Sequence, residues 1–132
     1  MVELDRVDRQ ILALLQADGR MSNAELAERI HLSPSACLRR VKHLEDTGLI
    51  EGYCMLLNQQ AIGKPTNVFV EISLKSQSDA MFAAFERAVA ACPAIMECYL
   101  MAGDADYLVR VIAADVADYE RVHRDHLSRL PG

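Results

Sequence analysis

The chain has no excess of basic residues. Lys and Arg together number 14 against 19 Asp and Glu, which gives a formal net charge of -5 over 132 residues. Proteins that coat nucleic acid through their overall charge carry the opposite balance. If this protein binds DNA, it must therefore do so through a local basic face.

A long hydrophobic run is also missing. No apolar segment approaches the length of a membrane span, and the start MVELDRVD does not have the pattern of a signal peptide. Hydrophobic residues make up 52% of the chain and charged residues 25%, as in ordinary globular proteins. We therefore expect a cytoplasmic protein with no membrane partner.

The spacing of the cysteines matches no common metal-binding, redox or disulfide motif. Cys37, Cys54, Cys92 and Cys98 form neither a CxxC pair nor a disulfide framework. In a cytoplasmic protein we expect buried thiols, with redox sensing as the alternative. For Cys37, which lies in a basic segment, a thiol switch is the functional interpretation and a small packed residue the favoured one, because nothing in the sequence predicts a lowered thiol pKa.

Motifs of catalysis are absent as well. The sequence has no glycine-rich phosphate loop, nucleophile elbow or zincin motif. His123 and His126 stand one helical turn apart, yet no motif places a third ligand, so a packed or solvated pair is favoured over a metal site. We therefore expect that the protein is not an enzyme and that it has no cofactor and no metal site.

The segment Leu32–Arg40, reading LSPSACLRR, carries the strongest positive signal. Ser33 is a suitable N-cap and Pro34 suits the first helical position. Between Arg29 and His43 the chain has four Arg or Lys residues, two His and no acidic residue. A capping box at Ser22–Glu25 opens a short helix just before, so the pair predicts a helix-turn-helix whose second helix faces DNA.

Three helices are expected in the first part of the chain, which we place at residues 1–57. Apolar residues at helical spacing, Leu4 to Leu15, form the first helix, which ends at Asp18-Gly19. Leu26 and Ile30 face inward from the second, and Leu38, Val41 and Leu44 from the third, so the helices share one small core. Leu49–Leu57 is expected to be a strand or small hairpin, a wing beside the helices.

The second part changes period after a polar linker at residues 58–65. Alternating residues predict a half-buried strand, Val68–Leu74, followed by a helix capped by Ser78. Two more strands and a helix capped by Asp115 are expected at Ile95–Met101, Tyr107–Ala113 and Asp115–Leu130. This order, over residues 66–132, predicts an α+β chain with a ferredoxin-like βαββαβ domain lacking its last strand.

The missing strand would pair with the first strand of the sheet. Without it, Val68–Leu74 becomes an apolar edge, which is an aggregation hazard. We therefore expect either further residues after Gly132 or a partner chain that covers this edge.

The chain as a whole resembles the Lrp/AsnC family, the feast/famine regulators of amino-acid metabolism. The matching segments follow in family order: LDRVDRQIL, DGRMSNAELAERIHLSPSACLRRVKHLE, GLIEGYCMLLN, VFVEISL, MECYLMAGDADYLVRV and HLSRLPG. The resemblance implies a transcription regulator that binds DNA through its winged helix-turn-helix. It also implies a second domain of the RAM type that dimerises, assembles further into octamer-like rings and senses an amino acid.

Residues of the third helix are the candidates for DNA contact. Basic side chains can neutralise phosphates and give a salt-dependent affinity, while arginine suits the edge of guanine. The N-terminal amides of the helix can hold another phosphate. The candidates are Ser33, Pro34, Ser35, Arg39, Arg40, Lys42 and His43.

The loop between the second and third expected strands is the candidate effector site. A free amino acid needs a carboxylate for its ammonium group and backbone N–H groups for its carboxylate. Asp104 or Asp106 can supply the first, and a tight turn at Gly103 the second. A plain β-turn is the competing interpretation, but the resemblance places the effector pocket here, at Met101, Ala102, Gly103, Asp104 and Asp106.

Two other functions remain open at this point. One is an amino-acid-binding or assembly module with vestigial DNA binding. The other is an architectural DNA-compacting protein without an effector, which the acidic composition disfavours.

Overall fold

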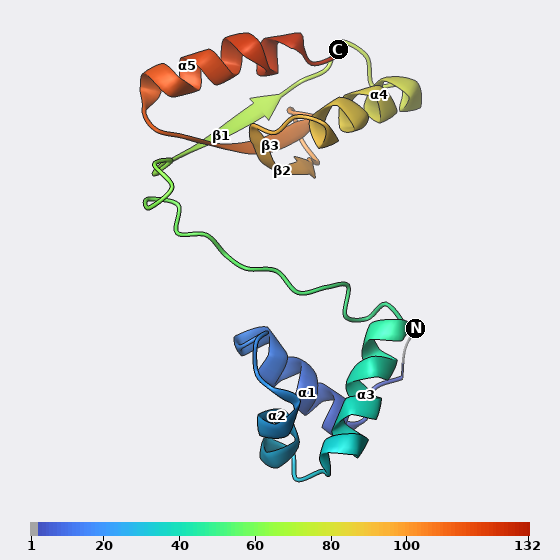
Figure 1. Ribbon diagram of the computed structural model, residues 1–132. Helices are drawn as coiled ribbons and strands as arrows, with labels where there is room; N and C mark the ends of the chain where they lie inside the picture. Colours follow the sequence, from blue (N-terminus) through green and yellow to red (C-terminus); the bar gives the residue numbers. More distant parts are fainter. Residues whose placement is uncertain (1–2) are drawn as a thin grey trace. The chain divides into compact units, whose positions relative to one another are not determined.

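The computed structural model describes residues 3–132. The chain divides into two compact units, Met1–Leu56 and Leu57–Gly132, which are shown in Figure 1 and described separately below. The first unit is helical, and the second combines a sheet with helices.

Capping residues begin each helix of the first unit. Ser22 accepts a hydrogen bond from the backbone N–H of Glu25, as predicted, although the described residues form only this half of the predicted capping box. A complete capping box occurs instead at Asp5 and Asp8, where the sequence analysis did not look for one. The helices are α1 (Arg6–Ala17), α2 (Asn23–Arg29) and α3 (Pro34–Asp46).

The three helices enclose one small aliphatic core, as expected. Ile11, Leu26 and Leu44 are at most 2% exposed. The prediction for Leu38 is wrong, because this side chain is 49% exposed and Cys37 is buried in its place. Cys37 lies seven residues before Leu44, which is two helical turns, so these two share a face of α3 that Leu38 does not.

The predicted strand or hairpin at Leu49–Leu57 is wrong for this structure. The segment begins with a bond from the Ile50 N–H to the Leu44 carbonyl, and its residues then form no strand. A strand needs a ladder partner, and the other described elements of this unit are helices. Met55 and Leu56 remain 80% and 92% exposed as a result.

The second unit contains a three-stranded antiparallel sheet and two α-helices. The strands run in the order β1-β3-β2. Among residues 3–132 no strand pairs with the other side of β1, so its predicted position at a sheet edge is confirmed. The elements are β1 (Thr66–Ile72), α4 (Asp79–Ala90), β2 (Ile95–Leu100), β3 (Tyr107–Ala113), α5 (Val116–Asp125) and a 3₁₀ turn η1 (Leu127–Arg129).

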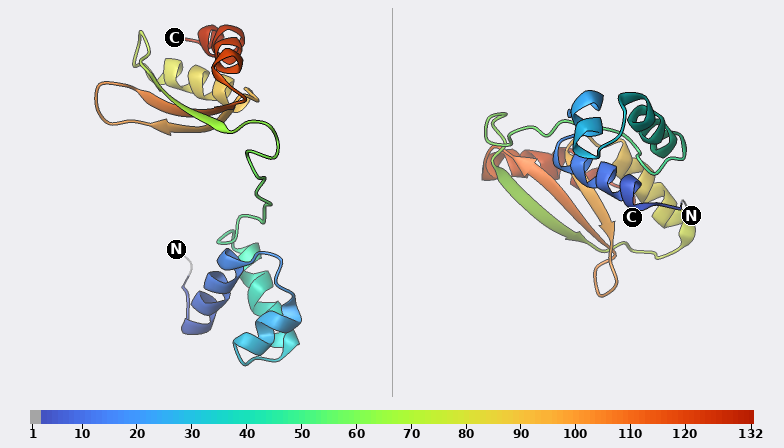
Figure 2. Two further views of the ribbon diagram at one scale, coloured as in Figure 1. Left: turned by 90° about the vertical axis from the view of Figure 1, so that its left-hand side faces the viewer. Right: turned by 90° about the horizontal axis from the view of Figure 1, so that it is seen from below.

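Both α-helices lie over the same face of the sheet (Figure 2, left view). Alternate residues of β3 point toward them, and Tyr107 and Val109 are at most 1% exposed. The Tyr107 ring stacks on Phe85 of α4, with centroids 4.5 Å apart. Residues of the opposite face, such as Phe69 and Tyr99, stay more than half exposed. The sheet therefore has one covered face and one bare face.

The segment at residues 58–65, predicted as a linker, is folded onto the second unit. Its backbone makes a turn in which the Lys64 N–H donates to the carbonyl of Gln59. The Lys64 ammonium lies 2.7 Å from the Asp118 carboxylate, which also accepts the Ala114 N–H and pairs with Arg121. These contacts, Lys64 first, lower the pKa of Asp118 to about 2.

Candidate nucleic-acid interface and ligand loop

The start of α3 is fixed by side chains of the helix-turn-helix itself. Ser33 accepts the N–H of Ala36, and its hydroxyl lies 3.3 Å from that of Ser35. Asn23, at the start of α2, donates to the carbonyl of Pro34 over 2.9 Å. Because both helix starts are joined, the N-terminal amides of α3 are held in one orientation.

Arg39, Lys42 and Ser35 form an exposed stripe along α3. All three side chains are exposed, and so is that of His43. Residues three and four apart lie on the same side of a helix, so Ser35, Arg39 and Lys42 follow one another along it. We call these three residues the α3 stripe. It presents two positive charges and a hydroxyl to a ligand outside the unit.

Arg40 does not belong to the α3 stripe. Its Nη1 lies 2.6 Å from Asp5 Oδ2 and 3.2 Å from Asp8 Oδ1, at the start of α1. The bond from Arg40 is the main cause of a lowered pKa of Asp5, and the same bond raises the pKa of Arg40. Sequence reasoning grouped Arg40 with its neighbours because the charges adjoin, but partners more than 30 residues away cannot be read from local spacing.

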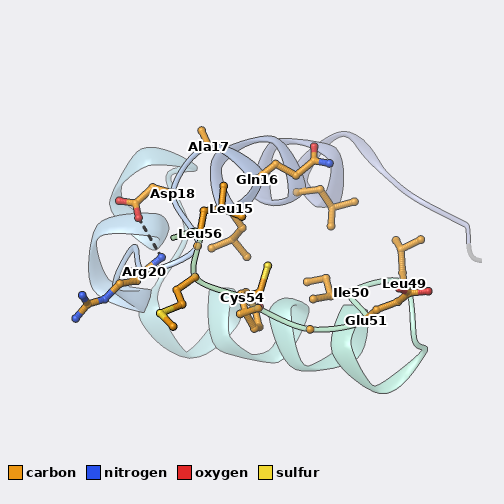
Figure 3. Close-up of a pocket in the computed structure, with 15 residues that line it drawn as sticks. Leu15, Gln16, Ala17, Asp18, Arg20, Leu49, Ile50, Glu51, Cys54 and Leu56 are labelled. Carbon is orange, nitrogen blue, oxygen red and sulfur yellow. Dashed lines mark hydrogen bonds between the residues drawn. The ribbon is translucent and has the colours of Figure 1, made fainter. Parts of the chain in front are cut away.

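The largest hollow found in the first unit carries none of the predicted site residues. It is a groove of 820 Å³ between the end of α1 and the extended segment after α3 (Figure 3). Apolar side chains such as Leu15, Ile50 and Leu56 line much of it. Its charged lining residues are Asp18, Arg20 and Glu51, so acidic side chains outnumber the single basic one, which does not favour a nucleic-acid phosphate.

The cysteines differ from one another, contrary to the prediction of four buried thiols. Cys37 is fully buried, and this burial raises the pKa of its thiol. Cys92 and Cys98 are half-buried, whereas Cys54 is exposed because its segment pairs with no other. The burial of Cys37 inside α3 supports its interpretation as a packing residue.

The predicted effector loop connects β2 to β3 as a hairpin. The N–H of Met101 donates to the carbonyl of Asp106 over 2.9 Å and closes the loop. Gly103 has a φ of +137°, a conformation that residues with a side chain rarely adopt. Ala102, Gly103 and Asp104 are exposed at its tip.

The two aspartates of this loop are placed differently. Asp106 Oδ2 accepts the Leu74 N–H over 2.7 Å and the Gln77 amide over 3.2 Å, so this carboxylate ties the loop to the end of β1. Asp104 makes no hydrogen bond or ion pair within residues 3–132 and is exposed. Of the two, Asp104 is the carboxylate available to a ligand.

His123 and His126 lie at the end of the second unit. The His123 ring packs edge-on near Tyr119, with centroids 6.3 Å apart. The part of the chain that the structure describes holds no group of three or more residues able to bind a metal ion. None of its helices is both long and apolar enough to cross a membrane.

Two family models match the chain, one for each unit. Residues 4–51 match a model described as winged helix-turn-helix DNA-binding. Residues 67–132 match a model described as the Lrp/AsnC ligand binding domain. The first match contains α1 to α3, and the second contains the sheet and the loop at Gly103.

Curated relatives match almost the full chain. It is 45% identical over 130 residues to the leucine-responsive regulatory protein of Escherichia coli K12, covering 98% of this chain and 79% of that protein. The protein of the same name from Serratia marcescens gives the same figures.

Solved structures agree with this result. A transcriptional regulator of Neisseria meningitidis in complex with L-Met is 34% identical, with a TM-score of 0.90 over 97% of this chain and 82% of that one. An AsnC family regulator of Agrobacterium tumefaciens is 35% identical, with a TM-score of 0.91 over 96% and 83%. With a DNA-binding unit, a ligand-binding unit and relatives along nearly its whole length, the chain belongs to the Lrp/AsnC family of DNA-binding transcriptional regulators, which are not enzymes.

Proposed function

We propose that the α3 stripe is the surface through which this regulator reads DNA. The observation that carries the proposal is the exposure of Arg39 and Lys42 on one side of a helix that follows a tight turn. Helix-turn-helix proteins place such a helix in the major groove. Arg39 and Lys42 then neutralise phosphates, Ser33, Pro34 and the first amides of α3 lie at a further phosphate, and Ser35 and His43 lie toward base edges.

Footprinting on the DNA upstream of the protein's own gene tests this proposal. We expect protection at helical-repeat intervals from the wild-type chain and loss of protection for R39A/K42A at moderate salt. Circular dichroism should show that the variant keeps its helices. Protection by R39A/K42A equal to that of the wild type would contradict the proposal.

We further propose that the second unit binds an aliphatic α-amino acid at the loop Met101, Ala102, Gly103 and Asp104. The relatives named above include leucine-responsive proteins and a regulator in complex with L-Met. The Asp104 carboxylate would meet the ammonium group, and the backbone amides around Gly103 would meet the carboxylate. Asp106 supports the loop from behind through Leu74.

Calorimetry with leucine and methionine tests the ligand proposal. D104N should weaken binding because it removes the charge that faces the ammonium group. The matched control is D125N on α5, which also removes one acidic charge and should bind as the wild type does. Equal affinities for D104N and the wild type would remove Asp104 from the site.

The protein is also proposed to form a homodimer through the bare face of its sheet. This face carries Phe69 and Tyr99, which are 59% and 52% exposed, around the ion pair of Arg110 and Glu97. Exposed apolar side chains gathered on one face are typical of a protein interface. Sedimentation should show a dimer, with larger rings as a further outcome, and F69E should dissociate it. A monomeric wild type would contradict this assignment.

Regulation follows if the amino acid binds one assembled or DNA-bound state better than another. The curated relatives named above come from bacteria, whose DNA lies in the cytoplasm, so we infer that this regulator acts there. Repeating the footprint with and without leucine or methionine tests the coupling, and an identical pattern would contradict it.

A further inference from the structure

Arg40 is bonded to both capping residues of α1, Asp5 and Asp8. Each of these carboxylates accepts two hydrogen bonds, one from a backbone N–H of α1's capping box and one from Arg40. Asp5 Oδ1 accepts the Asp8 N–H over 2.8 Å, while Asp5 Oδ2 accepts from Arg40 over 2.6 Å. In the same way Asp8 Oδ2 accepts the Asp5 N–H, and Asp8 Oδ1 accepts from Arg40. A single guanidinium nitrogen of α3 is therefore held by both members of the α1 capping box.

The charge of this cluster does not favour a phosphate. One guanidinium and two carboxylates leave Arg40, Asp5 and Asp8 with a net charge of -1. Asp8 also lines the hollow that Arg40 shares with Arg39 and His43, so a phosphate that approaches Arg40 there meets the Asp8 carboxylate as well. Phosphate contacts, in contrast, come from cations that can replace the counterions of DNA.

The position of Arg40 on α3 agrees with this. Cys37 and Leu44, three residues before it and four after it, are both fully buried. Arg40 therefore lies beside the buried face of the helix, and its side chain is 35% exposed. The α3 stripe lies on the outer side of the helix, where the side chains of Arg39 and Lys42 are exposed.

We propose that Asp5 and Asp8 withhold Arg40 from DNA, so that Arg40 is a positioning residue that fixes α3 against the start of α1. The inference rests on the proposed DNA contact of the α3 stripe. Its consequence is a lower affinity for DNA of any sequence, because one cation of the basic helix takes no part in neutralising phosphates. The regulator would otherwise spend more time at sites without sequence information.

The test measures binding of the full-length chain to a labelled duplex of mixed sequence over a series of KCl concentrations. The binding constant K falls as salt rises, and each phosphate contact adds about 0.9 to the magnitude of this negative slope of log K against log salt. Slopes are compared by this magnitude. R39Q should lower the slope by about 0.9, whereas R40Q and R40K should keep the wild-type slope. D5N/D8N should raise the slope by about 0.9 and tighten binding several-fold, because Arg40 is then released.

Two controls make the result specific. Asparagine is as good an N-cap as aspartate, so D5N/D8N should keep α1, which circular dichroism checks. The triple variant D5N/D8N/R40Q should return to the wild-type slope. E120Q/D125N removes two acidic charges from α5 and should leave the slope unchanged.

The outcomes separate this inference from the proposal on which it rests. A slope that falls for R40Q as it does for R39Q would make Arg40 a phosphate contact and overturn the inference while the α3 stripe stands. An unchanged slope for D5N/D8N, with its fold intact, would also overturn it. If R39Q and K42Q both keep the wild-type slope, the α3 stripe itself is wrong and the inference falls with it. R40Q decides the matter if D5N/D8N does not fold.

Discussion

The two units differ in the chemistry that stabilises the interior of each. The first has an aliphatic core around Ile11 and Leu44, with an ion cluster at its surface that joins α3 to α1. The second has an aromatic core, in which Phe85 stacks on Tyr107, and carboxylates that tie its loops to the sheet. In both units, contacts from far along the chain decide which charged side chains are paired, as Arg40 is with Asp5 and Asp106 with Leu74.

The largest expected effect comes from the aromatic core. F85A should lower the free energy of unfolding of the second unit by about 3–5 kcal/mol, because it removes a buried ring and leaves a cavity. Native-state hydrogen exchange should show faster exchange in β3 with little change in α1 and α3. Equal loss of protection in both units would show that they unfold together and would break the comparison.

Acid should act next, through Asp118 of the second unit. Its pKa of about 2 is lower than the ordinary value, so the folded state holds this carboxylate ionised more strongly than the unfolded state does. The stabilisation is complete above the ordinary pKa of about 4 and is lost as the pH falls toward 2.

Chemical denaturation between pH 6 and pH 2 measures this contribution. The wild type should lose more stability over that range than D118N, which has no carboxylate to protonate. D125N, on the same helix but with a weak partner at 3.5 Å, serves as the matched control and should follow the wild type. Parallel curves for the wild type and D118N would contradict the role of Asp118.

The two aspartates of the loop should separate stability from binding. D106A should lower the free energy of unfolding by about 1–3 kcal/mol, because it leaves the Leu74 N–H without a partner. D104A should change stability by less than about 0.5 kcal/mol, as an exposed substitution does. Thermal melting measures both, and equal losses would contradict the division of roles between them.

The smallest expected effect concerns the turn between α2 and α3. His31 has a φ of +58°, which costs a residue with a side chain about 1 kcal/mol. H31G removes this strain, but glycine also increases the conformational entropy of the unfolded chain, which destabilises the fold by about the same amount. The melting temperature of H31G should therefore equal or slightly exceed that of the wild type. H31V should melt lower, and a higher melting temperature for H31V would contradict the strain.

Much of the first unit could be predicted because its signals are local. Ser33 caps α3 and Leu44 faces the core as their spacing indicates. Leu38 was placed inward because it is large and apolar, but the face of α3 is set by packing around Cys37. The pairing of Arg40 with Asp5 depends on the meeting of two helices, and no local pattern carries it.

The second unit shows the same limit in another form. Burial alternates clearly along β1 and β3, and β3 is predicted at its observed bounds, Tyr107–Ala113. The strand expected within Leu49–Leu57 has the same apolar composition but finds no ladder partner among the described residues. The role of Asp106 was missed because its partner, Leu74, is 32 residues away. Local composition predicts elements, while the assignment of charges depends on tertiary contacts.

The central claim is that the α3 stripe carries the phosphate contacts of this regulator, and the salt dependence of DNA binding tests it most directly. The measurement compares the wild type with R39Q/K42Q on one duplex over the same range of KCl. Loss of two contacts should lower the slope of log K against log salt by about 1.8, with the fold intact by circular dichroism. A slope equal to that of the wild type would contradict the account.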